Sequence, residues 1–193
     1  DSDTLPSTAL VSSDLQFNSA YSSFSLDFDP GSNNYVNGGV NTSLVSATNF
    51  SISGWFYFDS VANNKTLFSY GGSGNNYGMT VQTFASGNLL FVIANAVTDS
   101  GYNYIGTNLS SVLTTSTWYN VVCTYDGSQA GNTDKAKIYI NGTEVAYAAG
   151  AGTIPATTSA STGPFNIGQW NLGGSNRFFD GKIDEVSIFN KTL

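Results

Sequence analysis

Ten short runs of aromatic and β-branched residues, separated by clusters of Gly, Asn and Ser, most limit what this chain can fold into. They occupy residues 25–28, 50–58, 66–70, 79–84, 89–94, 118–125, 137–140, 143–147, 165–167 and 182–189. Short strands at regular spacing, with turn signals between them, are typical of β-sandwiches and barrels. No stretch places apolar residues at the i, i+3, i+4, i+7 positions of a capped helix. The pattern predicts an all-β fold of two antiparallel sheets.

One hairpin is predicted in detail. Residues 135–140 alternate between apolar and polar, Asn141-Gly142 follows, and residues 143–147 alternate back. Asn-Gly is a strong signal for a two-residue type I′ turn, because both central residues of that turn need a positive φ. The small and polar stretches 99–117 and 148–163 are predicted as long loops.

The length and the change in pattern along the chain predict one folded domain. At roughly 100–200 residues per domain, 193 residues favour a single core. Residues 1–20 are rich in Ser and Thr with little periodicity, and we interpret them as a leader, linker or arm. We expect the sandwich to occupy residues 21–193.

Composition excludes several classes of function. A net charge of −7, with Lys and Arg scattered singly, leaves no basic patch for nucleic acid. The chain has no histidine, which excludes a Ser-His-Asp triad and His-ligated zinc or haem. No apolar run approaches the roughly 20 residues of a membrane span. The single cysteine, Cys123, lies in a strand run, and we expect a buried, inert thiol.

Three segments in series resemble a known family. They are LDFDPGSNNYV at 26–36 with FSISGWFYF at 50–58, then WYNVVCTYDG at 118–127 leading into KIYING at 137–142, then FNIG at 165–168 with FDGKIDEVSIFN at 179–190. In this order they resemble the laminin-G-like, concanavalin-A-like jelly roll of bacterial and viral surface proteins. The resemblance covers about residues 24–193. It implies a two-sheet antiparallel sandwich that binds glycans or proteins, in some members with structural calcium.

Glycoside hydrolases also belong to this superfamily, so the resemblance leaves catalysis to be judged from the residues. Such enzymes need two carboxyl groups across the scissile bond, and the hydrolase branch supplies them as Glu-x-Asp-x-x-Glu on one strand. The chain has two glutamates, Glu144 and Glu185, and neither has acidic partners at that spacing. We therefore expect no enzymatic activity.

Carboxylates near the two ends of the domain suggest a cation site. Asp27 and Asp29 lie early and Asp184 lies late, and the first and last strands of a sandwich are often neighbours. Calcium takes six to eight oxygen ligands, which these side chains and the turn after Asp29 offer. The alternative is that Asp29 bonds its own turn and Asp184 a loop amide. A second, weaker acidic loop combines Asp126 with residues 132–134.

Aromatic side chains in loops suggest a glycan site. A glycine-rich loop combines an indole with amides and a guanidinium, from Trp170, Gln169, Asn171 and Arg177. Sugars stack their C–H faces on exposed rings, so Trp170 is the predicted platform. Tyr102 and Tyr104 are the second choice. The alternative is that Trp170 folds back to cover the end of the sandwich, and Trp55 and Trp118, within strand runs, are predicted core residues.

These residues together predict a non-catalytic recognition module that binds a glycan or a cell-surface receptor through end loops. The low charge and the abundance of Asn, Ser, Thr and Gly suit an extracellular or virion surface. The competing hypothesis is a structural or decoration subunit of a virus particle or surface assembly. In that role the sandwich supplies protein–protein contacts, and residues 1–20 act as an arm that joins a neighbouring subunit.

Overall fold

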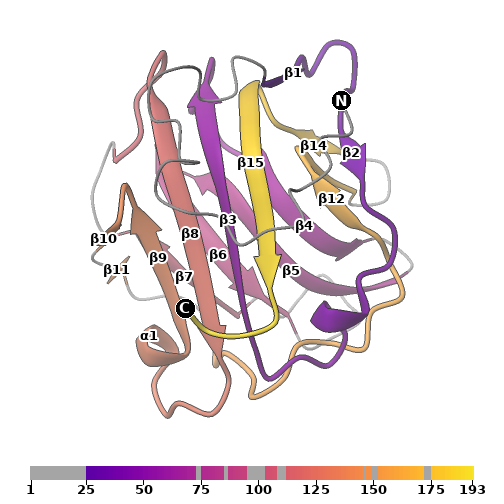
Figure 1. The fold of residues 1–193 in the computed structure, drawn as a ribbon, viewed down its shortest axis with the longest axis vertical. Helices are drawn as coiled ribbons and strands as arrows, with labels where there is room; N and C mark the ends of the chain where they lie inside the picture. The colour runs from indigo at the N-terminus through magenta and orange to yellow at the C-terminus, as the bar shows by residue number, and fades with distance from the viewer. Residues whose placement is uncertain are drawn as a thin grey trace, which may run out of the picture.

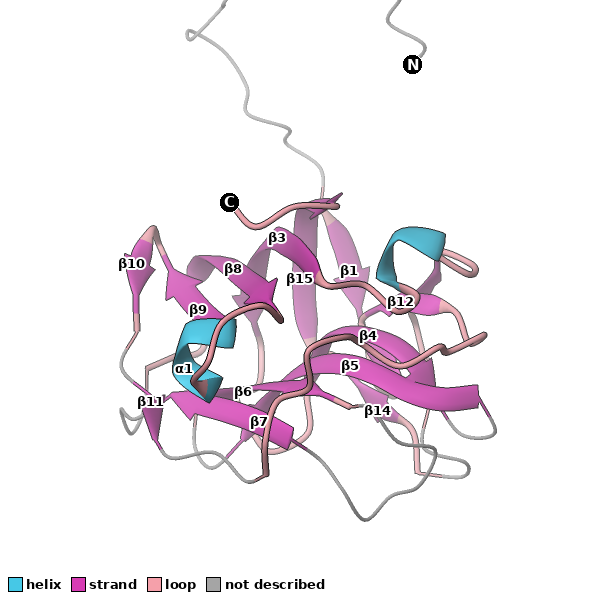
Figure 2. Ribbon diagram, turned by 90° about the horizontal axis from the view of Figure 1, so that it is seen from below, coloured by secondary structure: helices cyan, strands magenta, loops and turns pink. Residues whose placement is uncertain are grey.

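A computed structural model describes residues 25–72, 75–84, 87–94, 103–107, 112–145, 147–148, 152–171 and 175–193. Two antiparallel sheets lie face to face, with the first and last described segments on the same layer (Figures 1 and 2). The helical segments described are a 3-10 turn at Thr42–Leu44 and the single-turn α1, Asn132–Lys135. The predicted all-β sandwich is confirmed, and the predicted arm, residues 1–20, lies outside the described residues.

Sheet A forms the layer that faces the viewer in Figure 1. In spatial order it contains β1 (Leu26–Phe28), β15 (Gly181–Phe189), β3 (Asn49–Phe58), β8 (Trp118–Asp126), β9 (Ala136–Ile140) and β10 (Thr143–Glu144). The first strand therefore pairs with the last, as the sequence predicts, with Leu26 opposite Ile183 and Phe28 opposite Gly181.

Sheet B forms the second layer. In spatial order it contains β11 (Tyr147–Ala148), β7 (Asn103–Thr107), β6 (Asn88–Ile93), β5 (Asn75–Phe84), β4 (Thr66–Gly72), β12 (Phe165–Ile167) and β2 (Val36–Asn37). A two-stranded ribbon of β13 (Gln169–Trp170) and β14 (Arg177–Phe178) follows β12.

In the described part of the chain, no helix has the length and apolarity to cross a membrane.

The core lies between the sheets and is rich in phenylalanine. Alternate residues of β3 point inward, so Phe50, Ile52, Phe56 and Phe58 are all fully buried. Phe56 packs edge-on against Phe68 of the opposite sheet, with ring centroids 5.1 Å apart. Edge-to-face pairs of this kind add about 0.5–1.5 kcal/mol to the stabilisation from burial.

Cys123 lies in the same core. It is fully buried as a free thiol, and burial raises its pKa because the thiolate would lose its hydration. The prediction of a buried cysteine is confirmed.

The prediction that Trp55 and Trp118 are core residues is wrong. Both side chains keep 38% of their surface exposed, on the outer face of sheet A. The cause is the two-residue period of a strand. Phe56 and Val121 occupy the inward positions of β3 and β8, which leaves Trp55 and Trp118 on the outward ones.

The hairpin prediction is confirmed in its turn and wrong in its return strand. Asn141 and Gly142 have φ values of 51° and 77°, and Thr143 pairs with Ile140. After Glu144 the chain leaves sheet A, and β11 pairs with β7 in sheet B. The predicted loop over 99–117 is also wrong in part, because it contains β7, whose inner face buries Ile105 in the core.

Candidate functional site

A small polar hollow lies on sheet B where β2, β4, β12 and β13 come together. Its volume is about 130 Å³, and we call it the amide pocket. Its lining consists of Tyr35, Asn37, Gly71, Gly72, Pro164, Asn166, Gln169 and Asn171. Drug-sized ligands occupy pockets of about 300–1,000 Å³, so this hollow suits one small polar group such as a single sugar ring.

Strand register brings the amides together. β12 runs between β4 and β2, so Asn166 lies opposite Asn37 on one side and Ser69 on the other. Phe165 points into the core, which turns Asn166 to the outer face of the sheet. Gly72 allows the backbone of Asn171 to approach and form part of the pocket wall. A side chain at position 72 would prevent this, because its Cβ would lie 2.8 Å from the backbone oxygen of Asn171.

Asn166 is the distinctive residue of the pocket. Its exposed fraction is 2%, and its Nδ2 donates a long hydrogen bond of 3.4 Å to Gln169 Oε1. Its Oδ1 is buried and accepts no hydrogen bond from any residue that the structure describes. A buried acceptor without a donor costs about 1–3 kcal/mol. A ligand hydroxyl that donated to this oxygen would remove that cost.

The other lining groups add donors and a ring. Asn37 Oδ1 accepts from the backbone N–H of Gly39 at 2.9 Å, and its Nδ2 donates to no described residue, so it remains available as a donor. Tyr35 at the rim is 44% exposed, and its ring lies 6.4 Å from that of Phe178. The pocket thus combines an acceptor, amide donors and an aromatic face.

The prediction of Trp170 as an exposed platform is wrong. Trp170 lies in β13 with 3% of its surface exposed, and it packs edge-on against Tyr77 with centroids 5.8 Å apart. The Arg177 guanidinium lies 5.0 Å above the indole, and its Nη1 donates to Gln82 Oε1 at 2.9 Å. The two residues pack over β5 of sheet B. Trp170 is therefore buried, as in the alternative interpretation, but it covers this sheet and not the end of the sandwich.

The remaining predicted glycan residues divide between two regions. Gln169 and Asn171 line the amide pocket, on either side of the buried Trp170. Tyr104 is half-buried in β7 and does not line that pocket. Tyr102 lies outside the described residues.

Sequence reasoning missed Tyr35, Asn37 and Asn166. One signal for Asn166 was available: a polar residue between Phe165 and Ile167 in a short apolar strand must face away from the core. Tyr35 and Asn37 carry no comparable signal, because β2 has two residues and its pairing with β12 joins segments far apart in sequence.

The predicted cation ligands do not converge. Asp27 lies opposite Lys182, so Asp29 and Asp184 fall at opposite ends of the β1–β15 pairing. Four residues of strand separate their register positions, roughly 13 Å at about 3.3 Å per residue. Within the described ranges, no group of three or more metal-ligating side chains comes together.

Asp29 and Asp184 instead bond locally. Asp29 bonds its own turn, as the alternative interpretation has it, whereas Asp184 bonds the next residue of β15 and not a loop amide. Asp29 accepts from the Gly31 N–H and the Ser32 hydroxyl, both at 2.8 Å, and these bonds lower its pKa. Asp184 Oδ1 accepts from the backbone N–H of Glu185 at 2.8 Å.

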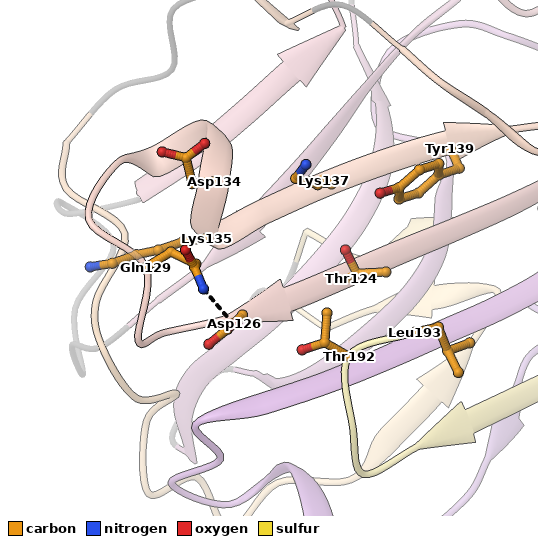
Figure 3. A pocket seen from close by; sticks show the side chains of 9 residues that line it. All are labelled: Thr124, Asp126, Gln129, Asp134, Lys135, Lys137, Tyr139, Thr192 and Leu193. Carbon is orange, nitrogen blue, oxygen red and sulfur yellow. Dashed lines mark hydrogen bonds between the residues drawn. The ribbon is translucent and has the colours of Figure 1, made fainter.

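A second hollow, of about 290 Å³, lies on the outer face of sheet A near the C-terminal residues and contains part of the weaker acidic loop (Figure 3). Asp126 accepts from the Ser128 hydroxyl and from Gln129 Nε2, and these bonds lower its pKa. Asn132 bonds the backbone of Gly152 and Ile154. These polar groups stabilise the loop, so the amide pocket is the stronger candidate site.

Comparisons with known proteins agree with the architecture. The family model for the concanavalin A-like lectin/glucanases superfamily matches residues 30–193. No curated protein matches the chain.

Solved structures share the fold at low sequence identity. A heptameric SAP-like pentraxin from Limulus polyphemus is 14% identical with a TM-score of 0.56, over 82% of this chain and 76% of that one. The CBM40 of a Ruminococcus gnavus IT-sialidase, bound to α2,3-sialyllactose, is 12% identical with a TM-score of 0.60, over 88% and 93%. NanB sialidase from Streptococcus pneumoniae is 21% identical with a TM-score of 0.61, over 88% of this chain and 26% of the enzyme.

Proposed function

The chain belongs to the concanavalin A-like lectin/glucanase superfamily, and we propose that it is a non-catalytic module that binds carbohydrate in the amide pocket. The observation that carries the proposal is Asn166, which lines the pocket and whose buried Oδ1 accepts no hydrogen bond from the described residues. Retaining such a group costs stability, and residues that cost stability are typical of functional sites.

The chemistry of the pocket fits a sugar better than an apolar or ionic ligand. A pyranose presents neighbouring hydroxyls, each both donor and acceptor, beside an apolar C–H face. Asn166 Oδ1 and Asn37 Nδ2 meet the hydroxyls, and the Tyr35 ring at the rim offers a surface for the C–H face. Among the described residues, no Asp, Glu, Lys or Arg lines the pocket, which favours a neutral hydroxylated group.

The similar fold of a carbohydrate-binding module bound to sialyllactose supports a carbohydrate ligand in general terms. That protein is 12% identical to this chain, so we do not propose sialyllactose as the ligand here. The ligand class proposed for this chain rests on the side chains that line its own pocket.

The position of the glutamates supports a non-catalytic role. Glu185 lies on β15 and Glu144 on β10, with β3, β8 and β9 between them in the sheet. Four strand spacings of about 4.8 Å place them roughly 19 Å apart. Glycosidase carboxyl pairs are separated by about 5–9.5 Å, so these two glutamates cannot act as one pair.

The proposal is tested on a glycan array, with hits measured by calorimetry for the protein and three variants. Tyr35→Ala removes the rim ring, and truncation of a central aromatic anchor typically weakens binding about thirtyfold or more. Asn166→Ala should weaken binding by at least tenfold with only a small change in melting temperature, because Oδ1 has no donor in the free protein and the bond that Nδ2 donates to Gln169 is long, at 3.4 Å. Phe84→Ala, which removes an exposed ring at the end of β5, is the matched control.

Absence of binding to every glycan would overturn the proposal. Binding unchanged in both Tyr35→Ala and Asn166→Ala would place the carbohydrate elsewhere on the module. Parallel titrations with calcium and with chelator test the structural calcium that the sequence predicts.

We further propose that the module acts outside a cell or on a virus particle, on the compositional grounds given above. The structural-subunit alternative has weaker support. The arm predicted for that role would add a strand to a sheet edge. In the described part of the chain the four edge strands of the two main sheets, β1, β10, β11 and β2, have two or three residues each. Short edges offer few unpaired backbone groups to a partner strand.

A further inference from the structure

The outer face of sheet A carries two rows of aromatic and polar side chains that the amide pocket does not use. In the first row Lys182, Tyr57 and Trp118 lie side by side on β15, β3 and β8. In the second row Asp184, Trp55 and Asn120 lie on the same three strands. We call these six residues the aromatic face. It is on the layer turned toward the viewer in Figure 1, whereas the amide pocket is on sheet B.

We propose that the aromatic face is a second carbohydrate-binding surface, which takes a neutral oligosaccharide by stacking on Trp55 and Trp118. This proposal does not depend on the amide pocket. The observation behind it is that the strand pairing places exposed indoles next to a carboxylate, an amide and an ammonium.

Trp55 is the centre of the arrangement. Its side chain is 38% exposed, and the strand pairing places Asp184 on one side and Asn120 on the other. Cross-strand neighbours have Cβ atoms about 4.5–5.5 Å apart, so both polar groups flank the indole. Asp184 Oδ1 accepts from Glu185 N–H, and no described residue donates to the second carboxylate oxygen. A sugar on Trp55 would therefore meet a hydroxyl acceptor at one edge and an amide at the other.

The first row extends this platform by one more sugar position. The rings of Tyr57 and Trp118 lie 5.6 Å apart, and Trp118 is as exposed as Trp55. Lys182 Nζ lies 4.9 Å above the Tyr57 ring and forms no ion pair with any described residue. Its ammonium supplies a hydrogen-bond donor beside the rings.

The surroundings favour a glycan over a protein partner. The cores of protein–protein interfaces are enriched in Trp and Tyr but depleted in Lys and Asp, and the six residues include both Lys182 and Asp184 and no aliphatic side chain. The C-terminal residues cover the other end of this sheet, where Ser51 Oγ donates to the Lys191 carbonyl at 2.9 Å. The aromatic end of the face stays accessible.

Tryptophan fluorescence offers a direct test, because Trp55 and Trp118 are exposed and Trp170 is buried. Acrylamide quenching is measured with and without cello-, xylo-, manno- and chito-hexaose. We expect at least one of these hexasaccharides to protect the exposed indoles. Trp55→Ala should weaken that binding about thirtyfold or more, and Trp55→Phe should recover part of it. Asp184→Asn should weaken it as well.

Two controls separate this proposal from the amide pocket. Tyr35→Ala and Phe84→Ala should leave the protection intact, since neither residue belongs to the aromatic face. Failure of all four hexasaccharides to protect would overturn the proposal, as would protection that survives in Trp55→Ala. A concentration-dependent dimer in sedimentation that Trp55→Ala dissociates would also overturn it, because a second copy of the chain would then cover the face.

Discussion

At the scale of single residues, the three tryptophans show where sequence reasoning works. Alternation within a strand assigns Trp55 to the face opposite Phe56, and this was readable in FSISGWFYF. The prediction that Trp55 and Trp118 are buried is wrong because it considered only that they lie within strands, and not which of the two faces each residue occupies. Trp170 was misjudged for the opposite reason, because its cover comes from Tyr77 of β5, a contact that spans most of the domain in sequence.

The two kinds of tryptophan should respond differently to truncation. Trp170→Ala removes a buried ring and should cost about 3–5 kcal/mol of unfolding free energy, as large core deletions do. Trp118→Ala removes a half-exposed ring and should cost about 1 kcal/mol or less. Urea denaturation of both variants gives the comparison. Equal losses would contradict the assignment of Trp170 as a buried residue packed over sheet B.

At the scale of elements, local signals predicted the longer strands and the hairpin turn, and they failed for strands of two residues and for a strand in a polar stretch. The ten predicted runs all contain strand residues, and β12 has the predicted bounds. β7 and the short β2, β13 and β14 were missed. β2 pairs with β12, which is far away in sequence. β13 and β14 pair with each other across a short connection, and two residues are too few to show an alternating pattern. β7 pairs with the preceding strand β6 but lies in a stretch of small and polar residues. The amide pocket is built from two of these elements, β2 and β13, so half of its wall was outside the reach of the sequence.

The hairpin turn itself can be tested by substitution. Gly142 has φ +77°, and a Cβ there would meet no atom within 4 Å, so Gly142→Ala should destabilise through backbone conformation alone. We expect a loss of about 1–2 kcal/mol in urea denaturation. Gly142→Asn should lose less, since Asn tolerates the left-handed region better. A neutral Gly142→Ala would show that the turn does not need its type I′ geometry.

At the scale of the whole molecule, the absence of histidine makes stability insensitive to pH near neutrality. The hydrogen bonds to Asp29 and Asp126 lower their pKa values in the folded state. The unfolded chain therefore binds more protons at acid pH, and stability falls as the pH drops below about 4 toward the folded pKa values. Between about pH 5 and 8 we expect a constant urea midpoint. A slope centred near pH 6.5 would contradict this account, and Asp29→Asn with Asp126→Asn should flatten the acid slope.

If the amide pocket holds a sugar, the side-chain amides that line it must respond to the ligand, which NMR can observe residue by residue. A ¹H–¹⁵N spectrum is recorded during titration with the glycan that gives the strongest array signal. We predict shifts in the side-chain amides of Asn37, Asn166 and Gln169, with Asn132 of α1, which does not line the pocket, unchanged as an internal reference. Saturating binding that leaves the Asn37 and Asn166 amides unmoved would contradict the claim.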